Sequence, residues 1–325
     1  MDEAPGTMSI LKDDAEPINR RGFIRSLFSL GGLHAATSTC DARAKAAFVW
    51  CDLLNGNVGF PTGLSVPTEK PGSLMKLVAA ACLVEENLLS LNEKFECTGT
   101  FAVGGRVAGK RDTSVHCQFA HGKVDLVRAL AVSCNCFFAQ ATSRLTKRTF
   151  LAKARQLGLA SPVAGRRGGI FPDGESASGQ SSLPYVLGLA EDFKPSCLQL
   201  MRMAALIAVG PEGKLPVLHS SENFTLAEKE KPLSVGLTRQ AREVLVAGMR
   251  HCVLEGTARK LDTQDKLKIA AKTGTTPHGK TFQSHIIGFF PFDKPRNAFC
   301  LFAPAGTSQD AAVPEAREIL FSTTW

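Results

Sequence analysis

Three short motifs, far apart in the chain, most restrict the fold that it can adopt. They read S-x-x-K from Ser73, S-x-N from Ser133 and K-T-G from Lys272. The first opens an apolar helix expected over residues 74–89, the second interrupts two helical stretches, and the third closes an apolar strand that starts near residue 267. A fold that uses all three motifs together must bring a helical part of the chain to the edge of a sheet.

The first motif predicts a nucleophile and its base. Ser73 is expected at the first turn of its helix, where free N–H groups and the helix dipole favour negative charge. Lys76 lies one turn further on the same face. A neutral lysine amine can take the proton that makes a serine hydroxyl reactive near neutral pH. Alone, the pair also fits a helix N-cap with a solvated lysine, and a second S-x-x-K at Ser9 shows that single motifs arise by chance.

The other two motifs supply groups suited to proton transfer and substrate binding. Ser133 could relay a proton to a leaving nitrogen, and both ends of an asparagine amide could bind a substrate amide. The lysine and threonines of the third motif suit a carboxylate, and its glycine suits close backbone approach. The alternative for the second motif is an ordinary helix cap, and the alternative for the third motif is a turn at the end of a strand. The expected residues are Ser73, Lys76 and Ser133 for catalysis, and Asn135, Lys272, Thr273, Gly274 and Thr275 for substrate binding.

In this order the motifs resemble those of the active-site serine penicillin-recognising enzymes. The likeness is broadest to the transpeptidase domain of class B penicillin-binding proteins of the elongation type, and it covers about residues 46–320. It includes the runs 95–99, 121–126, 133–138, 255–258 and 284–291. The resemblance implies a serine acyl-transfer enzyme that acts on D-Ala-D-Ala stem peptides of peptidoglycan and is acylated by penicillins and other β-lactams. Cell-envelope proteins are further expected partners.

Two other functions stay open. A serine β-lactamase would use the same site with fast deacylation, although no glutamate stands where class A enzymes place one for the deacylating water. A catalytically silent wall-binding or sensor protein would keep the fold but should carry a broken motif, and none of the three is broken.

The N-terminus predicts export. Arg20 and Arg21 precede a mildly apolar stretch over 26–36, which looks like a twin-arginine signal. Cleavage is expected near Ala44, with a lipoprotein site at Cys40 or a basic disordered tail as alternatives. We therefore expect residues 1–44 to be a signal segment and flexible N-terminus, and residues 45–325 to be one catalytic domain in the periplasm or cell envelope.

The ten cysteines predict no metal site by their spacing. There is no C-x-x-C pair, and Cys134-x-Cys136 with scattered histidines does not match a zinc pattern, so no metal or other cofactor is expected. Cys97 and Cys117 flank a glycine-rich stretch and could form a disulfide, while most of the others are expected to be buried thiols. The net charge is +8, but no basic patch interleaved with aromatic residues is present, which argues against nucleic-acid binding.

The expected fold class is α+β. Strands are predicted over 46–53, 267–275, 284–290 and 298–303, and the loops between the last three are short enough only for antiparallel neighbours. A short amphipathic helix is predicted over 313–321. The prediction is an antiparallel sheet flanked by terminal helices, plus an inserted all-helical lobe over about 73–210, with the ligand site between them.

Overall fold

The computed structural model describes residues 46–59, 67–103, 114–172, 181–220 and 232–325. The expected signal segment, with its arginine pair and Cys40, lies outside these residues. None of the described helices combines the length and the apolar character that crossing a membrane requires.

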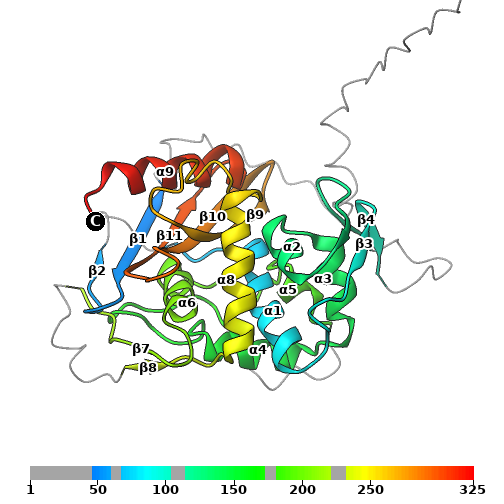
Figure 1. Cartoon of the computed structure of the whole chain (residues 1–325), viewed down its shortest axis with the longest axis horizontal. Coiled ribbons are helices and arrows are strands. Elements are labelled where there is room, and N and C mark those ends of the chain that lie inside the picture. The colour runs from blue at the N-terminus through cyan, green and yellow to red at the C-terminus, as the bar shows by residue number, and fades with distance from the viewer. Residues whose placement is uncertain (1–45, 60–66, 104–113, 173–180, 221–231) are drawn as a thin grey trace, which may run out of the picture. The chain divides into compact units, whose positions relative to one another are not determined.

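A five-stranded antiparallel sheet forms the centre of the fold, in the order β2–β1–β11–β10–β9 (Figure 1). Each predicted strand is present, and the antiparallel order is confirmed. β9 and β10 extend further toward each other than predicted, so that only Gly279 and Lys280 join them. Within the described sheet β9, which carries the K-T-G motif, is an edge strand. The strands are β1 (Ala47–Asp52), β2 (Val58–Gly59), β9 (Ala270–His278), β10 (Thr281–Phe290) and β11 (Asn297–Ala303).

Helices cover both faces of this sheet. α9 (Val313–Ser322), the predicted C-terminal helix, buries its apolar side against a cluster that includes Ile286. α6 (Cys197–Val209) packs on the opposite face, against a cluster that includes Ile287. Successive strand residues point to opposite faces, so Ile286 packs in one layer and Ile287 in the other. Both faces of the sheet therefore bury apolar side chains under helices, and the K-T-G motif lies on its edge strand.

The helical part of the chain lies beside β9 (Figure 1). α8 (Arg239–Leu254) stands between this part and the sheet and contacts both α2 and β9. Gly248 of α8 faces Leu130, where a Cβ would come within 2.6 Å of the leucine side chain. The other helices here are η1 (Gly72–Met75), α1 (Lys76–Glu85), α2 (Leu126–Ala131), α3 (Asn135–Ala141), η2 (Thr142–Arg144), α4 (Lys147–Gln156) and α5 (Leu183–Val186).

The predicted lobe is not entirely helical. Four three-residue strands form two small antiparallel sheets in it, β3 with β6 and β4 with β5. Strands this short give no readable alternation in the sequence, so they were not predicted. They are β3 (Phe95–Cys97), β4 (Thr100–Ala102), β5 (Ser114–His116) and β6 (Gly122–Val124), while β7 (Lys214–Leu215) and β8 (Leu233–Ser234) pair elsewhere.

Candidate active site

Ser73 lies in a 3-10 turn that runs directly into α1, as its sequence context predicts. The two residues that follow it are anchored in the core, because Leu74 and Met75 are fully buried while Ser73 keeps partial exposure. The turn therefore presents the serine hydroxyl at the surface of a rigid helix start.

Glycines at three positions let this turn pack closely against the K-T-G strand and against the segment that carries Gly188. Gly72 has φ +56, and a Cβ there would lie 2.9 Å from Cγ2 of Thr276 and 3.2 Å from the backbone nitrogen of Thr275. A Cβ on Gly274 would overlap the carbonyl oxygen of Pro71, and one on Gly188 would overlap the backbone of Gly72. Only residues without a side chain permit this approach, which places the Ser73 turn beside the Thr275 amide.

Lys76 joins the first two motifs. Its Nζ lies 3.0 Å from Ser73 Oγ, 2.7 Å from the carbonyl oxygen of Ser133, 3.3 Å from Ser133 Oγ and 2.5 Å from Asn135 Oδ1. The side chain is fully buried. Burial, and then the like charge of Lys272, lowers the pKa of Lys76 from 10.5 to about 7. Lys76 is thus poised to exchange a proton near neutral pH.

Ser133 occupies the break between α2 and α3, with φ +58. This left-handed conformation is uncommon for a residue with a side chain, and such strain collects at functional sites. The conformation places Ser133 Oγ 2.9 Å from Nζ of Lys272 and 3.3 Å from Nζ of Lys76. The hydroxyl accordingly bridges the two buried lysines, where a proton relay would need it.

Asn135 is held at both ends of its amide. Its Oδ1 accepts from Lys76, and its Nδ2 donates to the carbonyl oxygen of His116 at 2.7 Å. A carbonyl can only accept, so the second contact fixes which end of the amide faces the lysine. The prediction that both ends bind substrate needs refinement, because only the second Nδ2 hydrogen and the second Oδ1 lone pair are left for it.

The third motif divides into buried and accessible groups. Lys272 is fully buried, donates to Ser133 Oγ and to the carbonyl oxygen of Thr273, and has its pKa lowered by burial to about 8. Thr273 is also buried and pairs its hydroxyl with Thr257 at 2.5 Å. Thr275 is half-buried, and its hydroxyl oxygen accepts from the backbone N–H of Ser308 at 3.0 Å. Of the motif's side chains, Thr275 is therefore the most available to a ligand.

The structure corrects the predicted disulfide. Cys97 and Cys117 are neighbours, but they are free thiols whose sulfurs are 3.7 Å apart, against about 2.05 Å for a disulfide bond. The sulfur of Cys117 is engaged elsewhere: it accepts the backbone N–H groups of Asn135 at 3.1 Å and Cys136 at 3.4 Å. It also lies 3.8 Å from the sulfur of Cys134, and that thiol's hydrogen bond lowers the pKa of Cys117 to about 3.

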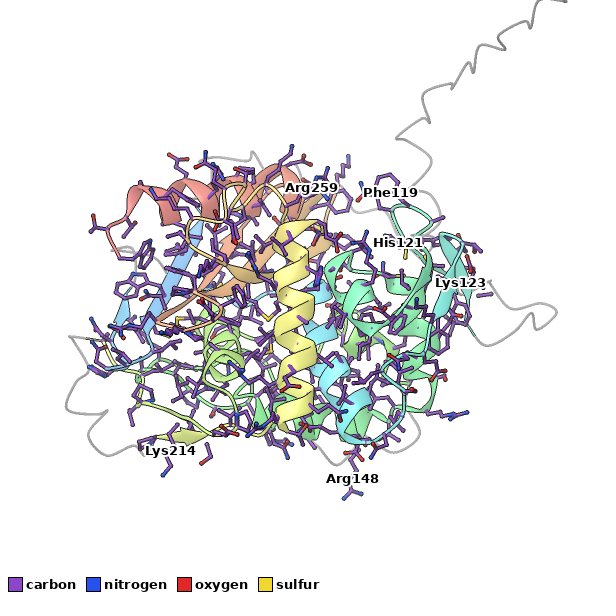
Figure 2. The ribbon with its side chains drawn as sticks, in the orientation of Figure 1. Phe119, His121, Lys123, Arg148, Lys214 and Arg259 are labelled. Carbon is purple, nitrogen blue, oxygen red and sulfur yellow. The ribbon has the colours of Figure 1, made fainter. Side chains whose placement is uncertain are left out.

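These thiols belong to a cluster that can hold a metal ion. Cys97, Cys117, His121 and Cys134 place one ligand atom each within 4.8 Å of one another. Figure 2 labels His121 on the loop before β6. With Zn–S bonds of about 2.3 Å and Zn–N of about 2.1 Å, a tetrahedral site puts two sulfurs about 3.8 Å apart and sulfur and nitrogen about 3.6 Å apart.

The observed spacings fit that geometry. The sulfur of Cys117 is 3.7 Å from that of Cys97 and 3.8 Å from that of Cys134, and Cys97 Sγ is 3.4 Å from Nδ1 of His121. Three thiols and one imidazole are the donors that Zn²⁺ prefers in structural sites. The four residues come from four segments of the chain, so their linear spacing gave no sound reason to exclude a metal.

Most of the predicted site residues come together, and four further residues contact them whose part in this site was not predicted from the sequence. These four residues form hydrogen bonds with the motif residues, as described above, and they are His116, Cys117, Thr257 and Ser308. The run around Thr257 was visible as part of the family resemblance. The other three act through a backbone carbonyl, a sulfur and a backbone N–H, none of which leaves a sequence pattern.

Comparisons with known proteins identify the family and related folds. A family model for the penicillin binding protein transpeptidase domain matches residues 62–321. The fold is similar to a chain of a peptidoglycan synthase complex that coordinates polymerization and crosslinking, with a TM-score of 0.68 at 23% identity over 85% of this chain and 55% of that chain. Comparison with curated proteins finds no match.

Two other solved structures show the same likeness. Penicillin-binding protein 2 from Helicobacter pylori has a TM-score of 0.68 at 19% identity, over 86% of this chain and 60% of that chain. Penicillin-binding protein 2 from Pseudomonas aeruginosa, in complex with WCK 5153, has a TM-score of 0.66 at 19% identity, over 84% and 69%. The chain spans 55–60% of the length of the first two structures. The family match covers well over half of the sequence, and the chain belongs to the penicillin-binding protein transpeptidase domain family.

Proposed function

We propose that the chain is a serine acyltransferase of the D,D-transpeptidase or carboxypeptidase type, with Ser73 as the nucleophile and D-Ala-D-Ala stem peptides as substrates. The observation that carries this proposal is the buried Lys76 amine, 3.0 Å from Ser73 Oγ, with a pKa near 7. A base with a pKa close to the working pH combines the right protonation state with enough driving force for proton transfer.

The contacts of Lys76 support a neutral amine as the resting base. A neutral amine has two N–H donors and one lone pair. Ser133 O and Asn135 Oδ1 can only accept, so they take the two donors. The lone pair is then left for the Ser73 hydroxyl, which donates its proton as its oxygen attacks the substrate carbonyl. Ser133 passes a proton to the leaving nitrogen.

The remaining roles follow from the edge of the sheet. The close approach of Gly72 to the Thr275 amide supports an oxyanion hole made by the backbone N–H groups of Ser73 and Thr275. The free side of β9 suits an extended peptide that binds as an added antiparallel strand. We assign the terminal carboxylate of that peptide to the Thr275 hydroxyl, with Lys272 behind Ser133 supplying positive charge.

A fluorescent penicillin tests the proposal. Wild-type protein should take one covalent label, which mass spectrometry of peptides locates at Ser73, and Ser73→Ala should take none while its melting temperature stays nearly unchanged. Label on the Ser73→Ala variant would overturn the assignment. A folded wild-type protein that takes no label from any β-lactam would favour the silent wall-binding or sensor alternative.

The lifetime of the acyl-enzyme separates this function from a β-lactamase. Among the described residues, no carboxylate contacts the side chains of Ser73, Lys76, Ser133, Asn135 or Lys272. A water beside the ester would thus lack a carboxylate base, and we expect a label that persists for many minutes. Rapid turnover of the penicillin would identify a β-lactamase.

We also propose that the protein is exported to the periplasm or cell envelope. The support is the arginine pair Arg20-Arg21 ahead of an apolar stretch. Replacing both arginines with lysine should leave the protein in the cytoplasm, because lysine lacks the planar, multi-donor head of arginine. Fractionation and immunoblotting would show this, and periplasmic accumulation of the double variant would contradict export by this route.

A further inference from the structure

Cys117 directly follows β5, away from all three motifs in the sequence, yet it touches the second motif. We propose that Cys117 is a positioning residue for acyl transfer: its sulfur holds the start of α3, and with it Asn135, in the geometry that Lys76 and the substrate need. This inference rests on the acyl-transfer function proposed above.

The sulfur of Cys117 caps a helix. It accepts the N–H of Asn135 at 3.1 Å and of Cys136 at 3.4 Å, which are the first two residues of α3. N–H groups in the first turn of a helix have no partner within the helix and need one elsewhere. Cys134 serves the same helix start, since its sulfur accepts the N–H of Phe137 at 3.3 Å. Two sulfurs thus do here what serine, threonine or aspartate side chains usually do.

The same segment also holds the side chain of Asn135. The carbonyl oxygen of His116 accepts from Asn135 Nδ2 at 2.7 Å, and the next residue, Cys117, holds the Asn135 backbone. Asn135 is therefore fixed through both its main chain and its amide by two consecutive residues. The loop that carries them is itself tied down, because Cys117 N–H donates to the carbonyl oxygen of Gly99 at 2.9 Å.

A short path of contacts leads from this sulfur to the nucleophile. Asn135 Oδ1 is 2.5 Å from Lys76 Nζ, which is 3.0 Å from Ser73 Oγ. Losing the sulfur would leave two backbone N–H groups without this acceptor, one part-buried and one buried, and we expect the helix start to shift in response. Such a shift would move the amide that binds both the base and the substrate.

The test compares Cys117→Val, which fills the space but accepts no hydrogen bond, with Cys117→Asp, whose carboxylate can accept the same two N–H groups. Cys51→Ala is the control, because Cys51 is a buried thiol in β1 on the sheet. Acylation rates would be measured with penicillin G, which has a side-chain amide for Asn135, and with 6-aminopenicillanic acid, which has none.

We expect Cys117→Val to lose about tenfold or more in acylation by penicillin G and clearly less by 6-aminopenicillanic acid. Cys117→Asp should recover most of that loss, and Cys51→Ala should keep wild-type rates on both compounds. A Cys117 residue that only supports packing would slow both β-lactams equally, without rescue by aspartate. Where the valine variant does not fold, Cys117→Ala takes its place.

The outcomes separate the two proposals. A wild-type protein that neither β-lactam labels contradicts the acyl-transfer function itself. A labelled wild type with an unaffected valine variant, or with equal losses on the two compounds, contradicts only the positioning role of Cys117.

Discussion

At the scale of single residues, the site depends on two buried lysine side chains that contact no carboxylate of the residues described in the structure. Both have a lowered pKa, mainly because burial disfavours the charged form, and the charge of Lys272 lowers the pKa of Lys76 further. The nearby thiols Cys117, Cys134 and Cys136 act in the opposite direction on Lys76. The balance leaves one amine able to accept a proton near pH 7.

The pH dependence of acylation should report this balance. Only the neutral amine of Lys76 can accept a proton, so the rate should rise as the pH increases through about 7. In Lys272→Met the like charge is gone, the pKa of Lys76 rises, and the rising limb should move to higher pH. Lys214→Met, which removes an exposed charge far from the site, should leave it in place (Figure 2). A limb that does not move in Lys272→Met would show that Lys272 has no influence on the base.

A second prediction concerns the backbone of Ser133. Its φ of +58 costs a residue with a Cβ about 1 kcal/mol more than glycine. The free energy of unfolding of Ser133→Gly, measured by urea denaturation, should therefore be about 1 kcal/mol higher than that of Ser133→Ala. Both variants should lose most acylation, because both lack the hydroxyl between the lysines. An alanine variant as stable as the glycine variant would contradict the strained conformation.

The motif residues can be read from the sequence, but their contacts could not all be predicted from it. Ser73 and Lys76 are one helical turn apart, so their meeting follows from local geometry. The burial of Lys272 behind Ser133 does not, because it depends on how the break between α2 and α3 meets β9 in the folded chain. The four metal-capable residues, likewise, become neighbours only through two small sheets whose strands are too short to recognise.

At the scale of elements, the contact between η1 and β9 determines whether the nucleophile and the oxyanion donors share one site. Their sequences are about 200 residues apart, and no hydrogen-bonded ladder joins them. Gly72 and Gly274 allow the approach by leaving out side chains that the neighbouring backbone would overlap. The helical part and the sheet can thus meet at this point because both positions lack a side chain.

Gly274→Ala should therefore separate the two elements. Its methyl group would overlap the carbonyl oxygen of Pro71, and overpacking of this kind costs about 1–3 kcal/mol. We expect acylation to fall at least tenfold, with a lower free energy of unfolding. Gly279→Ala, in the turn after the same strand, meets open space and should lose stability through its φ of +57 but keep its acylation rate. Unimpaired acylation in Gly274→Ala would contradict the close contact.

The elements themselves were the most predictable part. The long apolar strands and the C-terminal helix follow from periodicity, and the short loops between β9, β10 and β11 imply their antiparallel order. The part of the fold to which α6 belongs was predicted wrongly. This helix lies in the range predicted for the helical lobe, yet it packs on the sheet. An apolar helix buried all round gives no sign of which layer it faces.

At the scale of the whole molecule, the thiol cluster brings together residues from separate segments of the chain. Cys97 ends β3, Cys117 follows β5, His121 precedes β6, and Cys134 lies between α2 and α3. A metal ion bound to these four residues would cross-link all of these elements in the folded state only. Binding to the folded state stabilises it by mass action, by about 2.7 kcal/mol at a hundred times the Kd.

Zinc should therefore raise the melting temperature. Protein prepared in reductant and stripped with a chelator should melt several degrees higher after Zn²⁺ is added, and plasma mass spectrometry should find about one zinc per chain. Cys97→Ser should lose both effects, and Cys51→Ser, which changes a buried thiol outside the cluster, should keep them. Equal melting temperatures with and without zinc would show that the cluster is a set of plain thiols.

The contact between Gly72 and Gly188 limits how this domain can be recombined with its relatives. A Cβ on Gly188 would overlap the backbone of Gly72, and Gly72 N–H donates to the carbonyl oxygen of Gly188 at 3.1 Å. The two positions are more than a hundred residues apart, so a crossover between them takes each from a different parent. A chimera with such a crossover should fold stably only when both parents have glycine at residues 72 and 188. Libraries of recombined domains should therefore treat residues 72 and 188 as one inherited unit.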